Sequence, residues 1–127
     1  TKVKELLREN DFIWHDDSGE FRSRGGIPVH FLIAGEQAGK GSDVKIPEPL
    51  GKANVEQRDG LPVVRLSRLI ELKIASGQGS LRRTHKDFAD VVELIAIRGL
   101  DSSFARHLHP SLRATFRELV HRVKSEQ

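Results

Sequence analysis

The pattern of apolar and polar positions changes about halfway along the chain. Residues 10–65 hold short alternating or apolar runs separated by glycine, proline and aspartate, which is typical of strands and turns. Over residues 66–124, apolar residues recur every three or four positions, as on one face of a helix. Strands followed by helices favour an α+β fold over alternating βαβ units. We expect one domain over residues 1–127, in which a small mixed or antiparallel sheet packs against about four C-terminal helices.

The strand-rich half predicts several short elements. A helix over residues 2–9 precedes two strands in "DFIWHDD" and "EFRSR", joined by a turn. The stretch "IPVHFLIAG" is apolar on both faces after His30, which favours a central strand of the sheet. In "NVEQRDGLPVVRL", Asp59-Gly60 predicts the two-residue turn of a hairpin.

Residues 35–53 carry most of the glycine and proline and predict an exposed loop. Within this loop, "GEQAGKGS" resembles a phosphate-binding loop, but the two key glycines are one residue too close. Gly41 also stands where that motif needs a hydroxyl, and the prolines that follow oppose a helix. We therefore interpret the segment as a flexible loop.

The helical half predicts four helices, with start signals at two of them. Asp101 or Ser102 is suited to an N-cap, and Pro110 to a first helical turn. The helices are expected near residues 67–76, 85–97, 101–108 and 110–124.

Composition narrows the classes of function. The chain has no cysteine, which excludes disulfides and thiolate metal sites, and no apolar run of membrane-spanning length. We expect a cytoplasmic protein without a membrane partner. A net charge of +3 does not by itself indicate nucleic-acid binding, although basic residues cluster at 82–86 and 113–124. His107, His109 and His121 lack carboxylates at ligand spacing, so no metal site is expected there.

Two predicted helices place charge against the core. On helix 85–97, Asp87 lies at the edge of an apolar arc formed by Phe88, Val91, Val92 and Ile95. On the preceding helix, Lys73 falls within the apolar arc. Removing a lone ammonium from water is costly, so Lys73 needs an anionic partner unless it loses its proton or reaches back to solvent. We expect a structural ion pair between Lys73 and Asp87.

Packing does not account for the other cations at the start of this helix, which are Arg82, Arg83, His85 and Lys86. Two interpretations stay open. They form an ordinary solvated surface, or Arg82, Arg83 and Lys86 bind a phosphate or another anion.

The stretch "LPVVRLSRLIELKIASGQGSLRRTHKDFADVVELI" resembles the C-terminal half of minimal nucleotidyltransferases of the polymerase-β-like superfamily, including abortive-infection and toxin–antitoxin members. The shared pattern is a leucine-rich helix ending in Lys-x-x-Ala/Ser, a basic loop, and Arg-x-x-Lys-Asp-x-x-Asp. The resemblance covers roughly residues 4–100. Its motif positions in this sequence are Lys73, Ser76, Arg83, Lys86, Asp87 and Asp90.

Departures from the family pattern bear on catalysis. Family members hold two metals with a Gly-Ser or Gly-Gly turn, an Asp-x-Asp and a third carboxylate. No Gly-Ser…Asp-x-Asp start precedes residue 28, and His30 stands at the position of the third carboxylate. Magnesium prefers carboxylate oxygens, so no cofactor is expected unless a partner completes the site.

Three functional hypotheses follow from the residues and the resemblance. The first is a catalytically degenerate nucleotidyltransferase-like domain that acts by binding, in a toxin–antitoxin or mobile-element context, and forms a homodimer or binds a protein through an exposed sheet edge. The second is a nucleotidyltransferase, with a nucleotide ligand, completed by a partner chain or by upstream sequence. Because the sequence contains no methionine, even at position 1, we treat upstream sequence as an open alternative. The third is a nucleic-acid-binding module.

Overall fold

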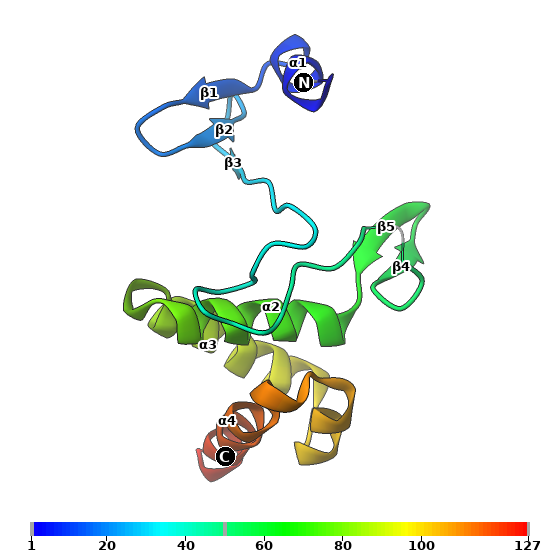
Figure 1. Cartoon of the computed structure of the whole chain (residues 1–127), viewed down its shortest axis with the longest axis vertical. Coiled ribbons are helices and arrows are strands. Elements are labelled where there is room, and N and C mark those ends of the chain that lie inside the picture. The colour runs from blue at the N-terminus through cyan, green and yellow to red at the C-terminus, as the bar shows by residue number, and fades with distance from the viewer. Residues whose placement is uncertain (1, 50, 127) are drawn as a thin grey trace. The chain divides into compact units, whose positions relative to one another are not determined.

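The computed structural model describes residues 2–49 and 51–126 (Figure 1). The fold is α+β, with small antiparallel sheets followed by helices, as expected. Its contacts group the chain into two compact units, Thr1–Leu32 and Ile33–Gln127, which are described separately. The assignment of the whole chain to a single domain stays a prediction.

The first unit contains a helix and a three-stranded sheet built around one aromatic side chain. Helix α1 (Lys2–Glu9) is followed by β1 (Ile13–His15), β2 (Glu20–Arg22) and β3 (Pro28–Val29), in the antiparallel order β1-β2-β3. Phe21 is fully buried, with the Trp14 ring centroid at 5.1 Å and the Phe31 centroid at 6.2 Å. Edge-to-face aromatic contacts of this kind add to the stability gained by burial alone.

The prediction of a central strand in "IPVHFLIAG" was wrong. Only Pro28–Val29 forms a strand, and β3 is the outer strand of its sheet. Proline has no backbone N–H to donate, so its place at a sheet edge follows from its chemistry. Ile27, Phe31 and Leu32, whose apolar character suggested burial on both faces, are 66%, 49% and 64% exposed.

The second unit opens with the glycine-rich loop and a hairpin. Strands β4 (Val55–Arg58) and β5 (Leu61–Val64) pair antiparallel. Asp59 and Gly60 have φ values of 51° and 78°, the left-handed conformation that a two-residue hairpin turn needs. The hairpin prediction is therefore confirmed.

The four predicted helices are present, but the first two, expected at 67–76 and 85–97, are longer than predicted. The observed elements are α2 (Leu66–Gly79), α3 (Leu81–Arg98), η1 (Ser102–His107), η2 (Pro110–Leu112) and α4 (Arg113–Ser125). The third is a 3₁₀ helix, capped by Asp101, whose side chain accepts a 2.9 Å hydrogen bond from the Ser103 backbone N–H. No helix within residues 2–49 and 51–126 is long and apolar enough to cross a membrane.

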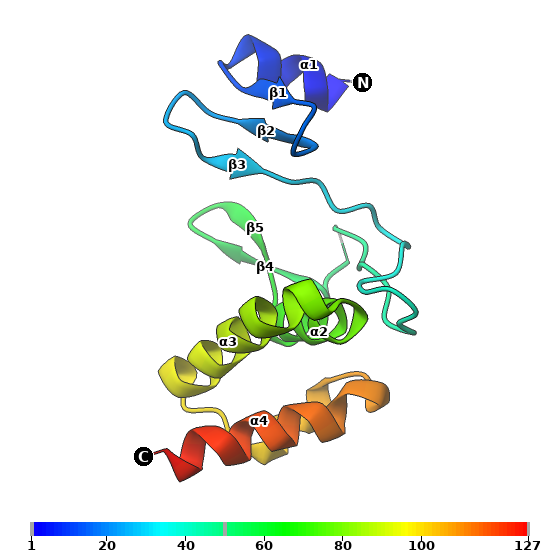
Figure 2. The ribbon, with the colours of Figure 1, turned by 90° about the vertical axis from the view of Figure 1, so that its left-hand side faces the viewer.

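Helices α2, α3 and α4 enclose the main hydrophobic core. Figure 2 shows α4 along the side of α3 that is turned away from the β4–β5 hairpin. The largest buried side chains of the core are Ile70 and Ile74 from α2, Val91 and Ile95 from α3, Leu112, and Phe116 and Val120 from α4. On α3, the buried Val91 and Ile95 belong to the apolar arc that the periodicity predicted for this helix.

The glycine-rich loop contributes to this core instead of lying free on the surface. Val44 is 6% exposed and belongs to the core cluster. A Cβ atom added to Gly39 would collide with the Ala75 carbonyl of α2, and one added to Gly79 would collide with the Lys40 backbone. The loop assignment is confirmed, but at these positions the backbone is fixed against α2.

Candidate functional site on helices α2 and α3

Gly77 allows α2 and α3 to approach closely. A Cβ atom at this position would lie 2.6 Å from Phe88 Cε1 and 3.4 Å from Asp87 Cβ. Thr84 lies in the first turn of α3. Its hydroxyl Oγ1 shares its hydrogen between the Gly77 and Ser80 carbonyls, at 2.7 Å and 3.0 Å. These contacts bring the charged residues of α3 alongside Lys73 on α2.

Lys73 contacts two carboxylates on the facing helix. Its Nζ lies 2.8 Å from Asp90 Oδ2 and 3.7 Å from Asp87 Oδ1. The structure therefore brings together the two residues expected to pair, and adds Asp90 as the nearer partner. Asp87 and Asp90 are three residues apart, so they project from the same side of α3.

Asp87 is the buried member of this cluster, with 1% of its side chain exposed. Arg83, one turn earlier on α3, places Nη2 at 3.2 Å from Asp87 Oδ1 and Nε at 3.4 Å from Oδ2. A carboxylate removed from water requires such compensation, because an unpaired buried charge is strongly destabilising. Lys73 supplies it from α2, and Arg83, whose side chain is 48% exposed, supplies it from α3 itself.

The remaining anion-binding candidates lie at the surface. Arg82 and Lys86 are both exposed on the first turns of α3. Within the described part of the chain, neither forms an ion pair, in contrast to Arg83. They leave two free cations on the helix that carries Asp90, whose side chain is 41% exposed.

His30 belongs to the first unit and pairs there with a carboxylate. Its Nε2 lies 2.7 Å from Glu20 Oε2, and the His30 side chain is 64% exposed. A hydrogen bond from Arg22 holds the pKa of Glu20 below its ordinary value, and the charges of Arg22 and His30 act in the same direction. In the structure, His30 thus stabilises the carboxylate of Glu20 on β2.

The acidic and histidine side chains are dispersed. Within residues 2–49 and 51–126, no three His, Asp or Glu side chains lie close enough to hold a metal ion. The charge cluster on α2 and α3 consists of carboxylates already paired with cations. Its arrangement is suited to joining two helices, and of the two aspartates Asp90 has the more exposed side chain, 41% against 1%.

A second polar cluster was missed by the reading of the sequence. Glu71 on α2 is 3% exposed, pairs with Arg68, and accepts a 2.6 Å hydrogen bond from the His109 backbone N–H. The His109 contact joins residues 38 positions apart and fixes the start of η2. The signal in the sequence was a glutamate inside the apolar stripe of the helix, analogous to that of Lys73.

Comparisons with known proteins add no assignment. No protein-family model, no curated protein and no solved structure matches this chain.

Proposed function

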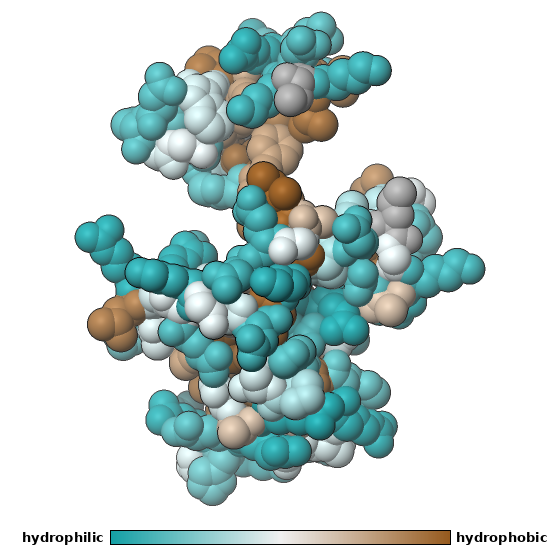
Figure 3. Space-filling model, viewed as in Figure 1, coloured by the Kyte–Doolittle hydropathy of each residue, from teal (hydrophilic) through white to brown (hydrophobic). Residues whose placement is uncertain are grey.

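We propose that this chain is a nucleotidyltransferase-like domain that acts by binding another protein, without nucleotidyl transfer of its own. The observation that carries the proposal is the exposed apolar segment around β3. Ile27, Phe31 and Leu32 each leave about half or more of their surface in contact with solvent. Figure 3 shows hydrophobic side chains gathered at the surface over the chain that follows β3.

The position of this segment in its sheet supports strand addition. β3 pairs with β2 on one side, and no strand among residues 2–49 and 51–126 pairs with its other side. Open edges that carry apolar side chains are templates for a further strand, which gains main-chain hydrogen bonds and buries alternate side chains. The partner we propose is an extended, apolar strand of a second protein. In the toxin–antitoxin or mobile-element context that the resemblance implies, this protein would be encoded beside the chain.

The paired charges of the second unit are consistent with binding in place of catalysis. Lys73, Arg83 and Asp87 satisfy one another between two helices, which is the arrangement of a structural ion-pair network. We assign them to holding α2 against α3.

A site-specific photo-crosslinker tests the proposal. Placed at Phe31, it should give one discrete adduct in the producing cell, whereas placed at Glu118, an exposed residue of α4, it should give none. The captured protein is then purified and its affinity measured by calorimetry. Leu32→Lys should weaken binding at least about tenfold, as expected for loss of a buried leucine contact. Leu61→Lys, at an equally exposed leucine of β5, should leave binding unchanged. Equal adducts from both positions, or equal effects of both substitutions, would exclude the edge.

A second candidate function, nucleotide binding, is favoured by one observation. Arg82 and Lys86 are free cations on the helix that presents the partly exposed Asp90. Calorimetric titration with ATP and GTP, with and without magnesium, tests it. Magnesium-dependent heat that disappears in Arg82→Ala would support a triphosphate site, and absence of heat would eliminate it.

A further inference from the structure

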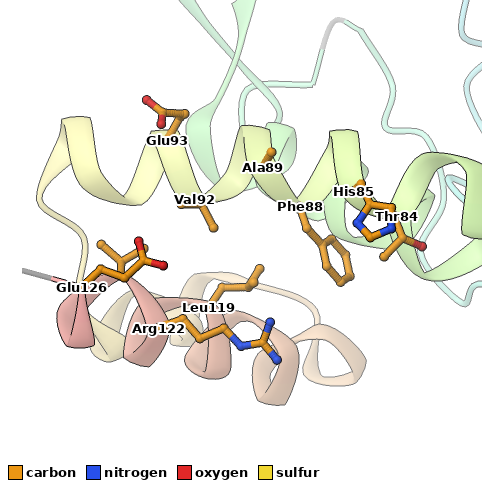
Figure 4. Close-up of a pocket in the computed structure, with 10 residues that line it drawn as sticks. Thr84, His85, Phe88, Ala89, Val92, Glu93, Leu119, Arg122 and Glu126 are labelled. Atoms are coloured by element: carbon orange, nitrogen blue, oxygen red, sulfur yellow. The ribbon is translucent and has the colours of Figure 1, made fainter.

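An apolar groove runs between α3 and α4 (Figure 4). It encloses about 560 Å³, and its floor is formed by Phe88 and Val92 from α3 and by Leu119 and Val123 from α4. Ala89 lines the α3 side of the groove, and because it is exposed and small it leaves the groove open to solvent there. A groove of this shape fits a side chain or a helix that approaches from outside.

The ends of the groove differ in charge. Figure 4 shows Glu126 on α4 at one end, with Glu93 projecting from α3 on the side away from α4, and His85 beside Thr84 at the other end. Arg122 also lines the groove and is paired with Glu118 on its own helix, at 2.7 Å. The basic end continues along α3 beyond the groove, where Arg82 is exposed and free of ion pairs among the described residues. On the side of α3 that carries Arg82, the charge is therefore basic toward the N-terminal end and acidic, at Glu93, toward the C-terminal end.

Leu81 extends the apolar line of the groove past its basic end. Leu81, His85, Phe88 and Val92 follow the four- and three-residue spacing of one helix face. Leu81 is 90% exposed, more than any other large hydrophobic residue of the described chain. An apolar side chain that projects beside an unfilled apolar groove forms a complementary pair of surfaces.

We propose that a second copy of this chain fills the groove, with the two α3 helices antiparallel about a two-fold axis. Leu81 and Glu93 are twelve residues apart, which is about 18 Å along a helix. A two-fold axis midway between them, near Asp87, brings Leu81 of each copy to the groove of the other. The same axis brings Arg82 of each copy to Glu93 of the other, because both residues lie on the same side of α3.

Charge complementarity selects a second copy as the occupant. A two-fold interface is self-complementary, so each end of the surface must match the opposite end of the same surface. Arg82 and Glu93, toward opposite ends of one side of α3, meet this requirement. The protruding Leu81 matches the far end of the groove, at Glu93, about 18 Å along the helix. This surface is separate from the β3 edge, and the inference does not rest on the proposed function.

Sedimentation of the full chain over two orders of magnitude in concentration tests the proposal. The unmodified chain should dimerise reversibly, and Leu81→Asp should raise the dissociation constant about a hundredfold, since two buried leucines are lost. An acidic residue in the first turn of α3 favours the helix, so Leu81→Asp should fold. Ile97→Asp is the matched control, because Ile97 is 74% exposed but lies about 160° round the same helix.

Charge reversal tests the antiparallel register. Arg82→Glu and Glu93→Arg should each weaken the dimer, and the double variant should restore it, because each copy then again pairs opposite charges. A chain that stays monomeric at every concentration would overturn the proposal. So would a dimer that Leu81→Asp leaves intact but Phe31→Asp dissociates, since that dimer would use the β3 edge.

Discussion

The Lys73 ammonium on α2 lies 2.8 Å from the Asp90 carboxylate on α3, nearer than the 3.7 Å that separates it from Asp87. The shorter contact is made with the more exposed carboxylate, and the longer one with the carboxylate that is almost fully buried. The two contacts therefore differ in energetic weight. Screening by water weakens the first, whereas the second compensates a charge that has left water.

Lys73→Ala should lower the free energy of unfolding by about 1–3 kcal/mol, because Asp87 keeps Arg83 but loses its second cation. Asp90→Asn removes only the exposed partner and should cost less than about 1 kcal/mol. Urea denaturation monitored by circular dichroism measures both. Equal losses in the two variants would show that the buried contact carries no special weight.

Gly77→Ala should destabilise the α2–α3 contact, because the new methyl group would meet the Phe88 ring at 2.6 Å. Overpacking of this kind costs about 1–3 kcal/mol, partly offset by about 1 kcal/mol of improved helix propensity. The control is a double-mutant cycle with Phe88→Ala. In that background, Gly77→Ala should become neutral or stabilising, and additive losses would contradict the close approach.

Glu71→Ala should cost about 1–3 kcal/mol, since the His109 N–H and the Arg68 guanidinium would both lose their acceptor. Glu118→Ala is the matched control. It breaks a 2.7 Å ion pair with Arg122 on the surface of α4 and should change stability by no more than about 1 kcal/mol. Chemical denaturation of the two variants in parallel distinguishes the buried from the exposed pair.

Asp101 should contribute a pH-dependent part of the stability. Hydrogen bonds from the Ser103 side chain and backbone N–H lower the pKa of Asp101 in the folded protein. Its contribution is therefore complete above the pKa of the unfolded chain, about 3.9, and is lost as the pH falls through the lower folded pKa. Asp101→Ala should lower the urea midpoint at neutral pH, and its deficit should vanish in acid. Asp101→Asn keeps an N-cap acceptor without this titration, so its midpoint should lack that pH dependence.

The elements that could be predicted from the sequence are those fixed by local chemistry. Asp59-Gly60 fixed the hairpin because few other residues adopt its left-handed backbone, and Asp101 began η1 through a bond to a residue two positions away. The apolar residues Val29 and Phe31 led to the wrong prediction of a central strand, because an apolar run looks the same in a central strand and in an edge strand. Only the number of neighbouring strands distinguishes the two, and that number is not local.

In the charge cluster on α2 and α3, the sequence likewise predicted that a contact exists but not which residue makes it. The position of Lys73 on the apolar arc indicated that it needed an anion on the next helix. Whether Asp87 or Asp90 lies nearer depends on how α2 and α3 cross, and Gly77 sets that approach. The contact between Glu71 and His109 depends on the path of the chain through two further turns, which the periodicity of α2 does not contain.

The close approach of Gly39 to the Ala75 carbonyl gives the glycine-rich loop a particular pattern of tolerance to change. Any side chain at this position must push the loop away from α2 and draw Val44 out of the core with it. In a library of all single substitutions, position 39 should accept glycine alone. The exposed Lys40 and Asp43 beside it should accept almost every residue. Gly39, in a segment that resembles a phosphate loop, would thus be retained by selection for folding, with no nucleotide involved.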